Sequence, residues 1–150
     1  MSKETLTAYR NAGAELVALA NGLTAEQINK VPADGEWPIS YIVHHIFDAE
    51  TYFATRYMNI LIYDNPAIVP FDEELLPAAL NYENRTLSSS VKGVAGMHAV
   101  VEEMLERISD DKWSRTGNHP ELGPVTLTQV LAKQAGHITE HVEQIKKLLA

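Results

Sequence analysis

The chain has 150 residues, of which 45% are hydrophobic and 21% charged, a composition typical of one globular domain. The formal net charge of -8 and the scattered positions of its 12 Lys and Arg residues argue against a nucleic-acid partner, because phosphate recognition depends on clustered cations. We find no apolar run that could span a membrane and no secretory signal, so we expect a cytoplasmic protein with no membrane partner and a single domain over residues 1–150. Cysteine is absent, so a metal would need His, Asp or Glu ligands, and thiol chemistry would need a thiol from outside.

Four segments with apolar residues at helical spacing follow one another, separated by clusters of Pro, Gly and Asn. We expect helices over about residues 3–21, 38–61, 88–108 and 126–150. Gly13 in the first helix leaves room for a neighbouring element to approach closely. A short capped turn follows that helix, with Thr24 as its N-cap and Gln27 at the reciprocal position of a capping box.

Four amphipathic helices around one core predict an all-α protein with the architecture of a four-helix bundle. The connection from Leu61 to about Leu87 is too long for a simple turn between neighbouring helices, so it predicts a long crossover. The stretch from Trp113 to Leu127 is too rich in Gly and Pro for a helix. We expect a loop there, with room for a short hairpin.

Two histidines lie four residues apart in the last helix. His137 and His141 fall on one flank of its apolar face, because side chains advance about 100° per residue. This spacing brings two imidazoles one turn apart, so that one helix can supply two ligands to a zinc-like ion. In the second helix, His45 lies at the edge of the apolar face. Three histidines on two helices are what a catalytic metal site with three protein ligands and one open position needs.

Plainer interpretations compete with the metal site. A His-x3-His pair on an amphipathic helix is more often a pair of partly solvated histidines, and the sequence does not show that the two helices adjoin. Helical geometry predicts that His44 faces water. His98 is interpreted as a boundary residue of the bundle, and His119 as a solvated loop residue, with a position over the site as the alternative.

The sequence also tests two rival metal chemistries. Ferritin-like di-iron bundles place a glutamate three residues before a histidine. The residues at that position here are Tyr41, Ile42, Ala95, Thr116, Gln134 and Ile138. None is a carboxylate, which argues against a di-iron oxidase. The His-Glu-x-x-His motif of zinc proteases is absent as well, since Ile138 follows His137.

The segments around these histidines resemble the DinB-like superfamily. Residues 36–50 read EWPISYIVHHIFDAE, similar to that family's Trp-Ser element followed eight residues after the Trp by a histidine. Pro38 stands where the family usually has Ser, a change that the first turn of a helix tolerates. Residues 123–127, GPVTL, and the later HITEHVEQI resemble the family's Gly-x-x-Thr-Leu element and its closing His-x3-His-x2-Gln helix.

The resemblance implies a bundle with a crossover, a homodimer, and a divalent ion, Zn or Ni, bound by His45, His137 and His141. Similar proteins include transferases and an isomerase that use mycothiol, bacillithiol or glutathione. We therefore expect a metal-dependent enzyme, in the first place a thiol S-transferase or a related transferase or hydrolase, that acts on a small electrophile with a low-molecular-weight thiol as cosubstrate. The alternative is a non-catalytic metal- or ligand-binding stress-related bundle protein.

The sequence does not identify a substrate, an acid or a base. Arg56, Arg85 and Arg115 are candidates for anchoring an anion, and Glu50 or Tyr52 for a place near the metal. Each is as readily an ordinary surface or packing residue. A third interpretation is a structural or dimerisation module in which the three histidines do not meet.

Overall fold

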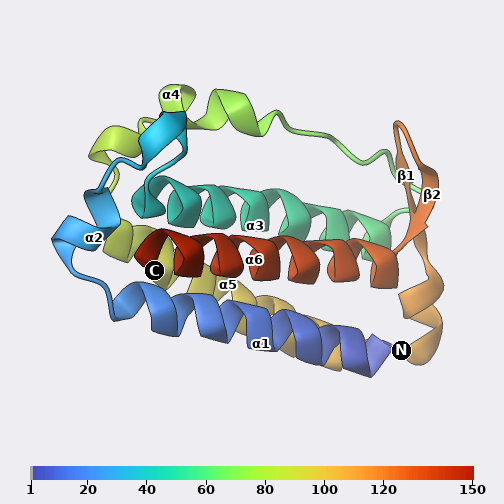
Figure 1. The fold of residues 1–150 in the computed structure, drawn as a ribbon. Helices are drawn as coiled ribbons and strands as arrows, with labels where there is room; N and C mark the ends of the chain where they lie inside the picture. Colours follow the sequence, from blue (N-terminus) through green and yellow to red (C-terminus); the bar gives the residue numbers. More distant parts are fainter. Residues whose placement is uncertain (1) are drawn as a thin grey trace.

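The computed structural model describes residues 2–150, apart from the side chain of Asp34. Four long helices form a bundle (Figure 1): α1 (Ser2–Asn21), α3 (Ile39–Ile62), α5 (Leu87–Glu106) and α6 (Leu127–Leu149). Each lies where the hydrophobic periodicity predicted a helix, with ends that differ by about two residues. The predicted all-α four-helix bundle is confirmed.

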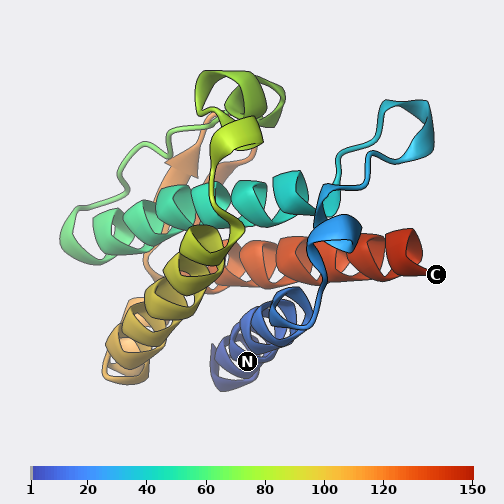
Figure 2. The same ribbon diagram turned by 90° about the vertical axis from the view of Figure 1, so that its left-hand side faces the viewer.

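The four helices enclose one core of apolar side chains. α1 packs against α5 and α6, and α3 packs against the same two helices, so that each helix has two neighbours in the bundle (Figure 2). α3 and α5 run in one direction, and α1 and α6 run in the opposite direction (Figure 1). α3 and α6 are therefore antiparallel neighbours, which brings the second and last helices of the sequence prediction together.

The predicted crossover connects α3 to α5. It leaves the end of α3, returns along the outside of the bundle and enters α5 beside the start of α3 (Figure 1). Three short helical segments lie within it, namely η2 (Glu73–Leu75), α4 (Leu76–Ala79) and η3 (Tyr82–Asn84). This return path explains why α5 is parallel to α3.

A short hairpin closes the end of the bundle where α3 stops and α6 starts (Figure 1). Strands β1 (Thr116–His119) and β2 (Gly123–Thr126) pair antiparallel, with His119 opposite Gly123. The hairpin is also joined to the crossover, because Ile68 N donates to Asn118 O at 2.9 Å and Asn118 N donates to Pro66 O at 2.7 Å. The loop predicted between Trp113 and Leu127 thus contains the hairpin, preceded by the 3-10 helix η4 (Asp110–Ser114).

Two further local predictions, one between α1 and α3 and one within α1, are confirmed. The short helix α2 (Ala25–Asn29) carries the capping box of Thr24 and Gln27, and the 3-10 turn η1 (Ala33–Gly35) follows it. Gly13 does admit a close neighbour, since a β-carbon at this position would overlap the ring of His98.

Among residues 2–150, none of the helices combines the length and the apolar character that a bilayer crossing needs.

Candidate metal centre

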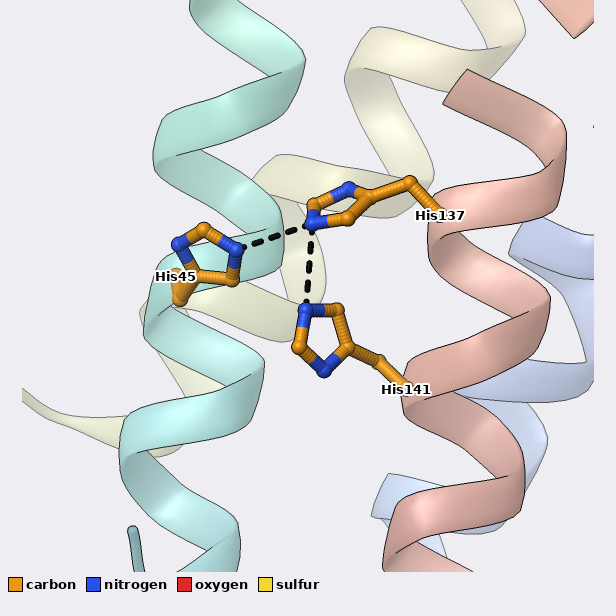
Figure 3. Close-up of side chains that lie close together, drawn as sticks. All are labelled: His45, His137 and His141. Carbon is orange, nitrogen blue, oxygen red and sulfur yellow. Dashed lines mark hydrogen bonds between the residues drawn. The ribbon is translucent and has the colours of Figure 1, made fainter. Parts of the chain in front are cut away.

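Three imidazoles meet between α3 and α6, and they are those of His45, His137 and His141 (Figure 3). The Nε2 atoms of His45 and His137 are 2.9 Å apart, and those of His137 and His141 are 3.1 Å apart. One nitrogen from each ring lies within 4.8 Å of the other two. His45 is fully buried, while the other two side chains are half-buried. The structure therefore brings together the three histidines that the sequence selected.

The ends of two helices set these positions. α6 begins at a capping box in which the side chain of Thr126 accepts from Gln129 N, and this fixes the helix that carries both His137 and His141. α3 begins directly after Pro38, as the sequence predicted, and places His45 in its second turn. The Trp37 ring meets His45 edge-on, with ring centroids 5.3 Å apart. The Trp of the sequence motif thus packs against one of the three rings.

Two glutamines orient the rings from behind. The Nδ1 atom of His137 lies 3.2 Å from Gln134 Oε1, and the Nδ1 atom of His141 lies 2.8 Å from Gln144 Oε1. The Gln134 amide has one sensible orientation, because its NH2 group donates to Glu50 Oε1 at 2.6 Å and an ionised carboxylate can only accept. The amide oxygen then faces His137, whose Nδ1 must carry the proton. His137 Nε2 is left as a lone pair directed at the other two rings.

Burial keeps two of the rings uncharged. Burial, reinforced by the charge of His141, lowers the pKa of His45 from 6.5 to about 4. Burial also lowers the pKa of His137 to about 3, with contributions from His141, His45 and Lys133. Both rings are therefore neutral at pH 7, which is the state in which imidazole binds a metal.

The donor set fits a small divalent cation. With Nδ1–H donated to a glutamine, His137 and His141 direct two lone pairs at each other across 3.1 Å, an arrangement that a cation between them stabilises. Nitrogens bound tetrahedrally at about 2.05 Å stand about 3.4 Å apart. The two separations of 2.9 and 3.1 Å therefore need to open by only a few tenths of an ångström. The remaining nitrogen, His45 Nδ1, is buried and has no hydrogen-bond partner among the described residues. Three imidazole nitrogens suit Zn or Ni better than Mg or Ca, which prefer oxygen.

A buried carboxylate stands behind the triad. Glu50 is fully buried, accepts from Tyr9 Oη at 2.7 Å and from Gln134, and lies 3.2 Å from His98 Nε2. The sequence marked Glu50 only as a residue that could stand near the metal. In the sequence, the residue three before each histidine was examined for a carboxylate alone, so Gln134 was passed over. A search for an amide at the same spacing would have identified Gln134 as a partner of His137.

Two predictions about histidines are wrong. His44 is fully buried, because the side of α3 that turns away from α6 is covered by η3 and α5, and its Nδ1 atom lies 2.8 Å from Ser90 Oγ. His98 is also inside the bundle, stacked on Tyr9 with ring centroids 3.9 Å apart.

A pocket of about 610 Å³ adjoins the triad at His137. Its walls come from α3, the crossover, the hairpin and α6. They consist of Phe53, Arg56, Ile68, Phe71, Glu73, His119, Leu122, Val125, Gln129, Val130, Lys133 and His137. Glu73 Oε2 lies 3.5 Å from His45 Nε2. His119 is half-buried in this wall, so the alternative position over the site is the one that the structure supports.

Tyr52, the other residue considered for a place near the metal, stacks instead on Phe71 with ring centroids 4.4 Å apart. The arrangement can hold an ion beside a largely apolar pocket, with charged groups at several points of its wall.

Curated proteins with similar sequences carry names of one kind. A protein of Oceanobacillus iheyensis named "Putative metal-dependent hydrolase OB0413" is 27% identical over 142 residues, which cover 95% of this chain and 80% of that protein. YfiT of Bacillus subtilis, with the same designation, is 25% identical over 136 residues, which cover 90% of this chain and 76% of YfiT.

Solved structures share the fold. YfiT, described as "a probable metal-dependent hydrolase with an unusual four-helix bundle topology", matches with a TM-score of 0.88 at 23% identity, covering 98% of this chain and 85% of YfiT. A mycothiol-dependent maleylpyruvate isomerase matches with a TM-score of 0.77 at 12% identity, covering 97% of this chain and 60% of the isomerase. The sequence profile of the DinB superfamily matches residues 8–145, nearly the whole chain. The protein belongs to the DinB superfamily.

Proposed function

We propose that the chain is a divalent-metal-dependent enzyme in which His45, His137 and His141 bind Zn or Ni and a low-molecular-weight thiol attacks a small electrophile. The observation that carries the proposal is the convergence of one nitrogen from each of the three rings, with the proton of His137 held on the far side of its ring by Gln134. A divalent ion with three imidazole ligands keeps one position open and lowers the pKa of a thiol or water bound there.

The chain's own residues prepare the site in three ways. Gln134 and Gln144 hold Nδ1–H of two ligands and leave Nε2 free. Burial keeps His45 and His137 neutral. The apolar walls of the pocket exclude water from the space next to His137, which protects a reactive thiolate from competing proton transfer.

A thiol is favoured over water as the nucleophile for two reasons. Glu73 is the single carboxylate in the pocket wall and its side chain is half exposed, so the wall offers little for the general acid and base steps of hydrolysis. A thiolate, by contrast, attacks an electrophile without a base. The fold likeness to a mycothiol-dependent isomerase supports the thiol, while the names of the relatives support hydrolysis. The proposal includes a homodimer, which size-exclusion chromatography with light scattering checks.

Metal content tests the triad directly. We expect untagged wild-type protein to retain about one Zn or Ni per chain, and His141→Ala to lose it, since two imidazoles bind far more weakly than three. His119→Ala is the matched control, because it removes a histidine from the same pocket but not from the triad. A wild-type protein without a stoichiometric divalent ion contradicts the proposal.

Turnover then separates the chemistries. Metal-loaded protein is mixed with glutathione, bacillithiol or mycothiol and a panel of small electrophiles, and thiol loss is followed. Thiol consumption that His141→Ala abolishes supports the transferase. Ester or amide hydrolysis without thiol consumption identifies a hydrolase, and bound metal without any turnover identifies the non-catalytic alternative.

A further inference from the structure

One arginine in the wall of the metal-site pocket has no carboxylate partner. Arg56 lines this pocket, yet no Asp or Glu among the described residues forms an ion pair with its guanidinium. Its one recorded hydrogen bond is from Nη2 to Val69 O at 3.0 Å, and its Nε atom is buried without an acceptor. A guanidinium has five N–H donors, so most of them remain available to a ligand.

The other arginines are neutralised. Arg10 pairs with Glu102, Arg85 with Asp48 at 2.7 Å, Arg107 with Glu103 at 2.8 Å, and Arg115 with Asp64 at 3.3 Å. Arg85 and Arg115, the two other arginines considered as anchors for an anion, are thus engaged within the protein. Arg56 differs from all of them, although it is more enclosed than Arg107.

The Arg56 side chain is held in place despite its missing partner. The guanidinium carbon lies over the ring of Phe53, 4.5 Å from its centroid, and 5.6 Å from that of Phe71. Burial lowers the pKa of Arg56 from its usual value, which is the direction expected for a cation that lacks a counter-charge. An unpaired, half-buried cation costs free energy, and a fixed one loses little entropy when it binds an anion.

Arg56 and His45 lie on the same face of α3. The eleven helical steps from His45 to Arg56 make three turns plus about 20°, and separate their α-carbons by about 16 Å along the helix. Lys133, one turn before His137 on α6, is a second cation in the wall without an ion pair among residues 2–150. Glu73 is the one negative group, and it lies beside His45 at the triad end.

We propose that Arg56 binds a carboxylate of the molecule that occupies the pocket, at the end opposite the metal site, with Lys133 adding to the positive potential. The proposal rests on the proposed function for the position of the reacting end. A planar guanidinium matches a carboxylate with two parallel hydrogen bonds. A phosphate dianion needs more donors than one guanidinium and one exposed ammonium supply, so the structure favours a carboxylate. The ligand is then a molecule with an apolar middle, long enough to reach from Arg56 to the triad, and it is either the thiol cosubstrate or the electrophile.

Isothermal titration of the full chain, with and without bound zinc, tests the anchor. The probes are 4-phenylbutyrate, the neutral 4-phenylbutyramide and glutathione, and the variants are Arg56→Met, Arg56→Lys and the control Arg107→Met. We expect Arg56→Met to weaken binding of 4-phenylbutyrate about 10- to 100-fold, and to change binding of the neutral amide less than about twofold. Arg56→Lys keeps the charge but cannot donate two parallel hydrogen bonds from a planar group, so its affinity for 4-phenylbutyrate should fall between those of wild type and Arg56→Met. Arg107→Met should match wild type.

The outcomes separate the two proposals. If Arg56→Met weakens the binding of glutathione, the carboxylate belongs to the thiol cosubstrate. If the variant weakens the binding of 4-phenylbutyrate alone, the carboxylate belongs to the electrophile. If Arg56→Met loses equal affinity for 4-phenylbutyrate and its amide, the anchor is overturned. The same holds if the variant loses no affinity for either 4-phenylbutyrate or glutathione, even when the protein holds one metal per chain. Arg56-dependent binding of an acid in a protein that retains no metal leaves the anchor standing and overturns the proposed function.

Discussion

The chemistry of single side chains at this site depends on which imidazole nitrogen carries the proton. For His137 the answer follows from a chain of contacts, since Glu50 fixes the Gln134 amide and the amide oxygen accepts from Nδ1. For His141 the corresponding group is the amide of Gln144. Such partners of ligand rings raise the basicity of the free nitrogen and fix the ring plane.

We predict that Gln144→Met weakens zinc binding about 10- to 100-fold, because His141 loses the acceptor that holds its proton on Nδ1. Competition with a chelating dye measures the change. Gln144 is half-buried and no carboxylate depends on it, so the metal-free melting temperature should stay close to that of wild type. Unchanged zinc affinity would show that the glutamine does not orient the ring.

A second residue-level prediction concerns acid stability of the metal-free protein. Burial and the charge of Arg85 lower the pKa of His44 from 6.5 to about 4. Between these two values the unfolded chain binds a proton that the folded protein does not, so the free energy of unfolding falls as the pH falls from 6.5 toward 4. His44→Asn removes this titration. The variant should therefore lose less of its free energy of unfolding on acidification than wild type, by on the order of 1–3 kcal/mol.

Urea unfolding at pH 7 and at pH 4.5 gives the change in the free energy of unfolding between these two pH values, for wild type and for His44→Asn. Comparing the two changes removes any effect of the substitution that does not depend on pH. His45 and His137 still titrate in the variant, so part of the loss must remain. An identical pH dependence in the two proteins would show that His44 is already protonated or remains neutral in both states.

At the scale of helices, periodicity predicted the elements but not all of their neighbours. His45 was placed correctly because it faces α6, on the side that carries the apolar stripe. His44 was misplaced because a helical wheel shows one apolar face, whereas α3 is covered on a second side by Tyr82 of η3 and by Ser90 of α5. That cover is made by the crossover, whose path depends on tertiary contacts far apart in the sequence.

Two glycines in long helices should respond in opposite ways to substitution by alanine. Gly13→Ala forces a β-carbon into His98, which is buried and stacked on Tyr9, so we expect a loss of about 1–3 kcal/mol in the free energy of unfolding. Gly96→Ala meets nothing within 4 Å and should gain about 0.5–1 kcal/mol from helix propensity alone.

Denaturant unfolding of both variants at one pH provides the comparison. A gain of stability in Gly13→Ala would mean that His98 can leave its place beside Glu50 without cost, and would remove the reason for a glycine at position 13.

At the scale of the whole molecule, the triad links segments that are distant in the sequence. His45 and His137 are 92 residues apart and belong to α3 and α6, which are antiparallel neighbours in the bundle. An ion that binds only the folded arrangement stabilises it by mass action.

We therefore expect zinc at about 100 times its dissociation constant to raise the melting temperature by roughly 10 °C. His45→Ala should abolish the shift although it leaves the His137 and His141 pair intact, and His119→Ala should keep it. Differential scanning fluorimetry at fixed protein concentration gives the measurement. A full shift in His45→Ala would indicate that α6 alone binds the ion.

The sequence predicted the bundle, its crossover and the three histidines, because helical periodicity and ligand spacing are local properties. It could not predict the pocket, whose wall combines Phe53 of α3, Phe71 of the crossover, Leu122 of the hairpin loop and Lys133 of α6. Nor could it show that Arg56 is unpaired while Arg85 and Arg115 are engaged, since pairing depends on which carboxylates the fold brings near.

The crossover contributes Phe71 and Glu73 to the pocket but none of the three histidines. The rings that meet between α3 and α6 therefore belong to the bundle core, whereas one wall of the cavity is formed by the crossover, in which Phe71 is half-buried and Glu73 is exposed. These two positions can vary with little repacking of the core. Substitutions at Phe71 and Glu73 can therefore change which molecules fit the pocket without moving the three histidines. A double variant at these two positions should alter ligand binding in the pocket while the three histidines stay in place.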